Sequence, residues 1–153
     1  SFYNITVNVS SAHNVVRVFQ NVNMKPDLNV YITLIQGYSK SDQLKEALSV
    51  YQEAKNEGHE FNESNHTLLI NLCLRNKQPL PGAKIALQMK AQNQTPELVT
   101  YHELLKQLVS SEHLDVIREI VHSIEDISIL QKIKFNDILA DAAWINPFKI
   151  ENL

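Results

Sequence analysis

The chain has 153 residues, a formal net charge of −3 at pH 7, 44% hydrophobic residues and 20% charged residues, the proportions of an ordinary globular domain. Its single cysteine, Cys73, excludes an internal disulfide and favours a reducing compartment, and its three glycines and five prolines argue against a β-rich or disordered chain. Because the net charge gives no bulk attraction to nucleic acid or to an anionic membrane, binding of either would have to come from a local basic stripe.

The first clear elements are two predicted amphipathic helices. Apolar residues at positions i, i+3, i+4 and i+7 between residues 31 and 38 form the stripe of one helix face. A polar break at 39–42 predicts a turn, and a second stripe of the same spacing predicts a second helix after it. The stripes consist of Tyr31, Leu34, Ile35 and Tyr38, and of Leu44, Ala47, Leu48 and Tyr51.

Both stripes recur at an interval of 35 residues. Shifted by 35, the chain aligns with itself without gaps through residue 126, so that Tyr31 falls on His66 and Tyr101. Polar breaks at 76–81 and 110–111 fall where the copied helices should end. A helix pair of this size cannot bury its apolar face alone, so stacked copies predict an all-α fold, an α-solenoid of 35-residue helix-turn-helix repeats. The alternative is an ordinary helical bundle in which the period is coincidental.

The clearest copy carries the marks of a known repeat. Residues 25–58 read "KPDLNVYITLIQGYSKSDQLKEALSVYQEAKNEG", with Pro-Asp before the unit, an early aromatic followed by Leu-Ile, then Gly-Tyr, Leu-x-x-Ala-Leu and a closing Lys-x-x-Gly. This stretch resembles the pentatricopeptide repeat. The later segment "TPELVTYHELL" repeats the opening of the unit with the family's Val-Thr-Tyr.

The resemblance divides the chain into units. A partial unit at 1–27 precedes whole units at 28–62, 63–97 and 98–131, and residues 132–153 are expected to form a partial repeat and a C-terminal capping segment. An apolar cluster in this last segment is interpreted as a cap on the open end of the solenoid, with a docking patch for a partner as the alternative. The cluster consists of Trp144, Ile145, Pro147 and Phe148.

The resemblance also implies a function and a set of binding residues. Proteins of this family are typically organellar solenoids that bind RNA with their first helices. One base is read per repeat, by the residue after the opening aromatic and the last residue of the unit. The corresponding base-reading candidates are Ile32 with Asn62, Thr67 with Glu97, and His102 with Gln131, while Asp27 and Asn136 are the single candidates of the partial units.

None of these pairs is a standard family pair. Ile32 has no polar atom to offer a base, and Thr67 with Glu97 resembles the family's Thr–Asp purine pair except that Glu is longer by a methylene. The position that packs against the base holds Val99 in the third unit. These departures favour contact with the RNA that does not depend on base identity within this segment.

Two cations are candidates for contact with the RNA backbone. Lys40 and Arg75 occupy equivalent places at the ends of two first helices, where the family can place a phosphate-binding residue, and Ser110 is their equivalent in the third copy. The alternative is that basic residues favour helix C-termini because of the helix dipole.

No catalytic or metal site is expected. The six histidines lack His-Glu-x-x-His spacing, His66 falls in an apolar stripe and is predicted to be a core residue, and the other five are predicted to lie on the solvated surface. Cys73 falls on a core position as well, and the sequence has no Gly-rich phosphate loop. We therefore expect no enzyme activity, no cofactor, no small-molecule substrate and no membrane partner.

The leading hypothesis is binding of single-stranded RNA, with an organellar transcript as partner. The expected location is the mitochondrion, with the plastid as the alternative, and no targeting segment is present in this chain. The alternative function is a protein-interaction scaffold, such as a structural subunit of a mitochondrial ribonucleoprotein or ribosome, in which the RNA-reading code is lost.

Overall fold

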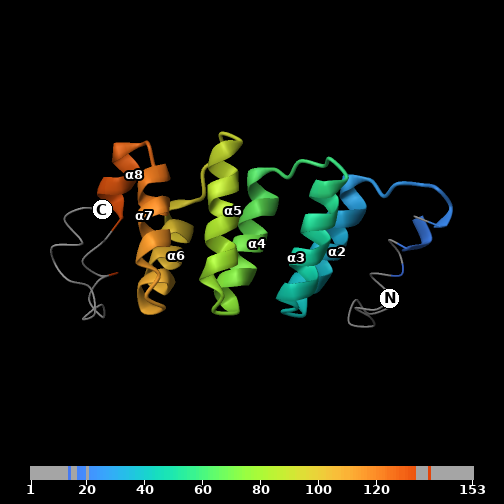
Figure 1. Cartoon of the computed structure of the whole chain (residues 1–153), viewed down its shortest axis with the longest axis horizontal. Coiled ribbons are helices and arrows are strands. Elements are labelled where there is room, and N and C mark those ends of the chain that lie inside the picture. Colours follow the sequence, from blue (N-terminus) through green and yellow to red (C-terminus); the bar gives the residue numbers. More distant parts are fainter. Residues whose placement is uncertain (1–13, 15–16, 20, 134–137, 139–153) are drawn as a thin grey trace. The chain divides into compact units, whose positions relative to one another are not determined.

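The computed structural model describes residues 14, 17–19, 21–133 and 138, and all regular secondary structure in this part of the chain is helical (Figure 1). The predicted all-α fold class is thereby confirmed. The elements are α2 (Leu28–Lys40), α3 (Leu44–Asn56), α4 (Glu63–Arg75), α5 (Pro79–Ala91), α6 (Leu98–Ser110), α7 (Leu114–Ser123) and α8 (Ile127–Lys132).

The helices repeat at the predicted interval. The first helices of the predicted units, α2, α4 and α6, begin at residues 28, 63 and 98, and the second helices, α3, α5 and α7, begin at residues 44, 79 and 114. All of them have 13 residues except α7, which has 10 and is followed by the six-residue α8. The exact unit boundaries stay predictions, which these starting positions support.

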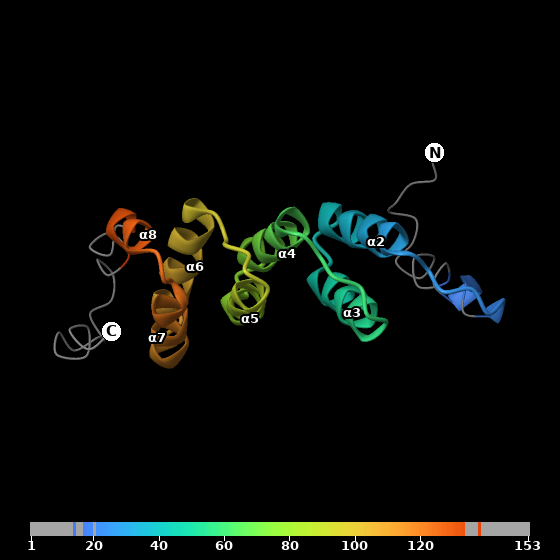
Figure 2. The same ribbon diagram turned by 90° about the horizontal axis from the view of Figure 1, so that it is seen from above.

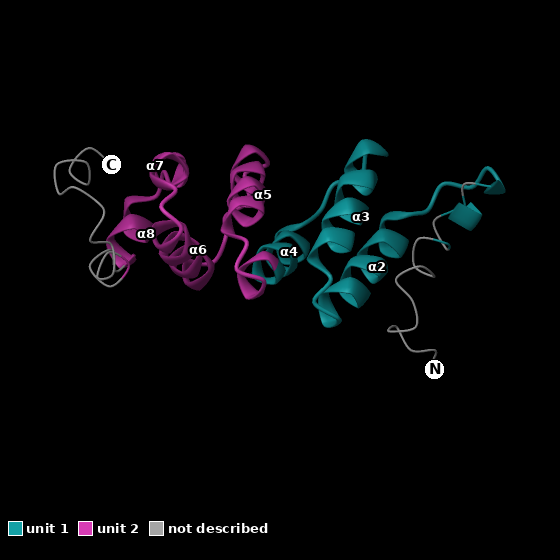
Figure 3. Ribbon diagram, turned by 60° about the horizontal axis from the view of Figure 1, so that its bottom comes forward, with its two compact units in different colours: residues 1–72 teal, residues 73–153 magenta. Residues whose placement is uncertain are grey.

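The chain divides into two compact units, residues 1–72 and 73–153, with the division inside α4 (Figure 3). In the first unit, α2 and α3 pack side by side as a helical hairpin (Figure 2). In the second unit, α5, α6 and α7 contact one another. Short turns connect the two helices of each pair.

The apolar stripes identified in the sequence form the core. Their residues point inward because positions three and four apart share one helix face. The position held by Ala47, Gly82 and Ile117 is buried in all three copies. The other buried members include Tyr31, Ile35, Tyr38, Val50, Tyr51 and Ala54 in the first unit, and Ile85, Met89, Tyr101, Leu104, Leu105, Leu108 and Ile120 in the second.

An aromatic cluster reinforces the first unit. The hydroxyl group of Tyr51 is hydrogen-bonded to Nε2 of His66 at 3.1 Å, and the ring of Phe61 packs on Tyr51 with the centroids 4.9 Å apart. His66 is 1% exposed, which confirms the prediction that it is a core histidine. The hydrogen bond satisfies a polar ring nitrogen that would otherwise be costly to bury.

The helices α2 to α6 all end in one type of turn. The N–H group of Gln43 donates to the carbonyl of Tyr38 and that of Asp42 to the carbonyl of Ser39, the bond pattern of a Schellman motif. This motif needs one residue in the left-handed region. All six described residues with positive φ fall at two places in the 35-residue register: Asn23, Gly58 and Asn93, and Asp42, Lys77 and Glu112.

Candidate nucleic-acid interface

Three of the candidate base-reading residues at the ends of the predicted units, Asp27, Asn62 and Glu97, lie immediately before the first helices. Asp27 is the N-cap of α2, where its Oδ1 accepts a hydrogen bond from the N–H group of Val30 at 3.0 Å. Asn62 makes the same contact before α4, where its Oδ1 accepts from the N–H group of Asn65 at 2.8 Å. These two side chains therefore also stabilise helix starts.

Glu97 differs from its two equivalents. It is the N-cap residue of α6 and is exposed, but its side chain makes no capping hydrogen bond. Neither carboxylate oxygen of Glu97 therefore accepts a hydrogen bond from the first N–H groups of α6. The extra methylene explains the difference, since the N-cap position prefers the short side chains of Asp, Asn, Ser and Thr.

The first member of each candidate pair lies within the first two turns of a first helix. Ile32, Thr67 and His102 are each half-buried, on α2, α4 and α6 respectively. Each first helix therefore combines an N-cap candidate with a second candidate five residues further along. Of the remaining candidates, Gln131 is an exposed residue of α8, and Asn136 lies outside the described residues.

Each first helix also carries a row of residues at spacing i, i+4, i+7 and i+11, which we call the outer stripe. Residues at this spacing lie on one helix face. Most of these residues are exposed, Val99 by 69%, while Leu68 and Glu103 are half-buried. The outer stripe consists of Asn29, Thr33, Gln36 and Lys40 on α2, of Ser64, Leu68, Asn71 and Arg75 on α4, and of Val99, Glu103, Lys106 and Ser110 on α6.

The candidate phosphate-binding cations end two of these rows. Lys40 and Arg75 are exposed and are the last residues of α2 and α4. The last turn of α6 contains no basic residue, because Ser110 takes the equivalent place. On α2, Lys40 lies about 12 Å along the helix axis from Ile32, given a rise of about 1.5 Å per residue.

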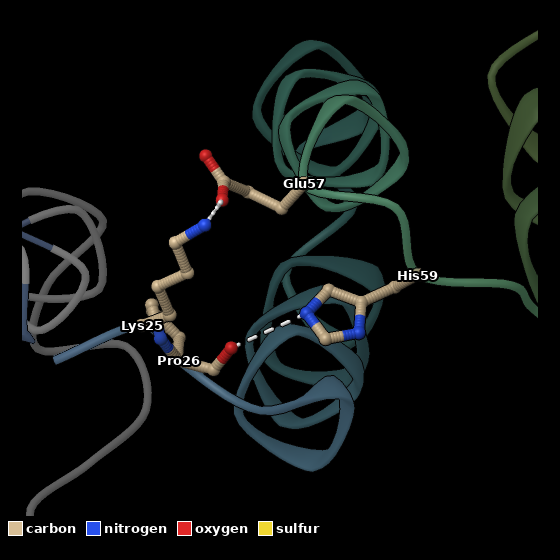
Figure 4. Close-up of polar contacts among 4 residues, drawn as sticks. All are labelled: Lys25, Pro26, Glu57 and His59. Carbon is tan, nitrogen blue, oxygen red and sulfur yellow. Dashed lines mark hydrogen bonds and ion pairs between the residues drawn. The ribbon is translucent and has the colours of Figure 1, made fainter.

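Contacts between distant residues hold the segment that leads into α2 (Figure 4). Nε2 of His59 donates to the carbonyl oxygen of Pro26 at 3.3 Å, and Nζ of Lys25 lies 3.6 Å from Oε2 of Glu57. The His59 ring also packs against Tyr31, with the centroids 5.4 Å apart. These contacts fix the backbone directly before the N-cap of α2.

The position of His59 corrects the prediction that it lies on the solvated surface. The side chain is half-buried, donates a hydrogen bond to the carbonyl oxygen of Pro26 and packs against the ring of Tyr31. His102 and His113 are also half-buried, whereas His122 is exposed as predicted. The correction arises because the partners of His59 lie 28 and 33 residues away, beyond the range of a helical pattern.

In the second unit, Gln107 forms a hydrogen bond to Glu103 of the outer stripe of α6. Its Nε2 donates to the carbonyl oxygen of Leu74 at 2.9 Å and to Oε1 of Glu103 at 3.0 Å. The Glu103 carboxylate is therefore tied to the residue four positions later. Between Glu103 and Ser110, Lys106 is exposed.

Lys106 was not identified from the sequence. Its equivalents in the register are Gln36 and Asn71, so it belongs to no repeated basic position. A comparison of complete exposed rows, rather than of helix ends alone, would have found it.

Other kinds of site do not emerge in the described residues. Within 14, 17–19, 21–133 and 138, His, Cys, Asp and Glu side chains form no group of three or more that could hold a metal ion. None of the helices described here has the length and apolar character needed to cross a membrane. The C-terminal cluster around Trp144 lies outside the described residues.

Comparisons with known proteins agree with the repeat. Residues 26–75 match the PPR repeat family. The chain is 32% identical over 107 residues to the human pentatricopeptide repeat-containing protein 1, mitochondrial, an alignment that covers 65% of this chain and 15% of that protein. The chain thus spans a small part of the length of this relative.

Solved structures share the fold. The crystal structure of the pentatricopeptide repeat protein PPR10 from maize matches 83% of this chain and 18% of its own chain, with a TM-score of 0.61 and 18% identity. PPR10 in complex with an 18-nt psaJ RNA element matches 75% of this chain and 17% of its own, with a TM-score of 0.52 and 20% identity.

Proposed function

Because residues 26–75 match the PPR repeat family, we propose that the chain binds single-stranded RNA and that each first helix, α2, α4 and α6, contacts it through its own outer stripe. The observation that carries the proposal is that α2 and α4 each combine base-reading candidates at the N-cap and in the second turn with an exposed cation, Lys40 or Arg75, at the last residue of the helix. Short polar side chains on a rigid helix can hydrogen-bond the edge of an unstacked base, while the cations neutralise phosphates. The binding of RNA by PPR10, a protein of the same fold, supports this assignment.

The three helices are not equally suited to base recognition. Thr67 and His102 each offer a hydrogen-bonding group, whereas Ile32 offers none. The Oδ1 atom of Asn62 is engaged in a cap, so its amide NH₂ group is the part available to donate to a base. Glu97 makes no capping bond and can accept from a base N–H group. We therefore assign base contacts to α4 and α6 and mainly backbone contact to α2.

The proposed cellular role is in RNA processing, stability or translation in an organelle. The relative with 32% identity is named as a mitochondrial protein, which favours the mitochondrion over the plastid for this chain. The proposed partner is an organellar transcript, bound without catalysis and without a cofactor.

The test is RNA binding by the chain across a salt series. We expect Lys40→Glu with Arg75→Glu to weaken binding of a pool of labelled single-stranded RNAs at least tenfold. The slope of log K against log salt should fall by about 1.4, since each phosphate contact to a single strand contributes about 0.7. The matched control is Lys45→Glu with Lys84→Glu, which reverses two exposed lysines on the second helices α3 and α5.

Comparison of the two double variants distinguishes specific phosphate contacts by Lys40 and Arg75 from a general effect of net charge. Equal losses in both double variants would show that only net charge matters and would refute the assignment of Lys40 and Arg75. Absence of binding by the unmodified chain at low salt would refute RNA binding by this segment. That outcome would favour the scaffold alternative, which the net charge of −3 and the apolar Ile32 already support.

A further inference from the structure

We propose that Lys106 is the RNA phosphate contact of α6 and takes the role that Lys40 and Arg75 have on α2 and α4. The inference rests on the proposed RNA-binding function and extends it to a residue outside the repeated basic position. It assigns a phosphodiester group of single-stranded RNA as the ligand.

On α6, the position equivalent to Lys40 and Arg75 is held by Ser110 and cannot supply a positive charge to a phosphate. Ser110 carries no charge, and the last turn of α6 has no basic residue. The Ser110 hydroxyl group donates to the carbonyl oxygen of Lys106 at 3.1 Å, so it is turned back onto its own helix. A phosphate at this end of α6 needs a cation from elsewhere.

Lys106 lies on the required face. It belongs to the outer stripe of α6, four residues before Ser110 and seven after Val99, so all three side chains project from one side of the helix. The step from Ser110 back to Lys106 is about one turn, or about 6 Å along the axis. The four-carbon stem of lysine is long enough to span a turn and carries a mobile point charge that suits a phosphate.

The neighbouring acid, Glu103, forms no ion pair with Lys106 among the described residues. Glu103 is three residues away on the same stripe, but its Oε1 accepts from Nε2 of Gln107 at 3.0 Å. Gln107 is itself anchored to the carbonyl oxygen of Leu74. Among the described residues, the recorded ion pairs do not include Lys106, which is exposed to solvent.

The test neutralises the charge with the residue that α2 already has at this place. Lys106→Gln should weaken binding of a labelled single-stranded RNA severalfold at 100 mM salt and lower the salt slope by about 0.7. The matched control is Lys84→Gln, which removes one exposed charge from α5 in the same unit and should leave the slope unchanged. Circular dichroism confirms that both variants fold.

A second variant moves the cation instead of removing it. Lys106→Gln combined with Ser110→Lys puts the charge where Lys40 and Arg75 lie, and it should restore the slope of the unmodified chain. If the unmodified chain binds RNA but Lys106→Gln matches the Lys84→Gln control, the assignment of Lys106 is wrong and the proposed function stands. If the unmodified chain does not bind, the proposed function fails and this assignment fails with it.

Discussion

Three buried tyrosines differ in what their hydroxyl groups contact. The Tyr51 hydroxyl is hydrogen-bonded to His66, whereas those of Tyr31 and Tyr101 are buried without a hydrogen-bond partner among the described residues. Tyr31 and Tyr101 occupy the same register position, where the first helix enters the core. Their rings therefore contribute mainly apolar packing, and the desolvated hydroxyl groups reduce that gain.

This difference predicts opposite effects of the same substitution. Tyr31→Phe and Tyr101→Phe should change the free energy of unfolding by less than about 0.5 kcal/mol or raise it, because they remove an unpaired buried group. Tyr51→Phe should lower it by about 1–2 kcal/mol, because it leaves the buried His66 ring nitrogen without this partner. Urea unfolding of the three variants measures the differences, and equal losses in all three would contradict this account.

Burial also makes the stability of the chain depend on alkaline pH. Burial raises the pKa of Tyr51, of Tyr101 and of the Cys73 thiol to about 12 in each case. In the unfolded chain these groups titrate near their ordinary values of about 10 for tyrosine and about 8.5 for cysteine. The folded state therefore retains protons that the unfolded state loses.

The sign of the effect follows from this linkage. The contribution of these groups is fully present below pH 8.5 and decreases as pH rises from there toward 12. We expect the free energy of unfolding to fall by about 3 kcal/mol between pH 7.5 and pH 10, with Cys73 contributing most. Cys73→Ala should flatten the curve between pH 8 and 10 in urea titrations, and an unchanged curve would exclude the thiol as its cause.

Among the elements, the first helices differ most at their N-termini. Asp27 and Asn62 cap α2 and α4, while Glu97 leaves α6 without a side-chain cap. The backbone at Glu97 is extended, with φ −66° and ψ 153°, close to the conformation of Asp27. The backbone at the start of α6 therefore already has the N-cap conformation, and only a shorter side chain at position 97 is needed to accept the capping hydrogen bond.

A shorter acid should supply that cap. Glu97→Asp is expected to raise the free energy of unfolding by about 0.5–1 kcal/mol, because a carboxylate at the N-cap can accept from the first N–H groups of the helix. Asp27→Glu is the matched control and should lower it by a similar amount, because it removes the observed bond to Val30. The change at α6 is measured by urea unfolding, and a loss of stability in Glu97→Asp would contradict this role of side-chain length.

In the turns after the helices, the position of a residue in the 35-residue repeat predicts a positive φ even where the residue type does not favour one. Asn23, Gly58 and Asn93 favour the left-handed region that they occupy, whereas Lys77 and Glu112 do not. Lys77 and Glu112 adopt it because they lie 35 and 70 residues after Asp42, at the same point of the same Schellman turn. The repeated turn thus places Lys77 and Glu112 in the left-handed region, which their residue types disfavour.

For the whole molecule, periodicity made the fold predictable. The spacing of apolar residues fixed which helix faces are buried, and the 35-residue interval located the starts of α2, α4 and α6. Both signals are local or strictly repeated, so they need no knowledge of distant contacts. The positions of the candidate residues on the first helices could be predicted for the same reason.

The sequence alone therefore determined the helical repeat, its core faces and the positions of Lys40 and Arg75. The tertiary structure decided which candidate side chains already have partners: Asn62 is engaged in a cap, Glu97 is not, and His59 is held by Pro26. It also showed that Glu103 is tied to Gln107 and leaves Lys106 exposed. Helical spacing records which face a residue occupies, but hydrogen-bond partners and exposure depend on side-chain reach and on groups brought together by folding.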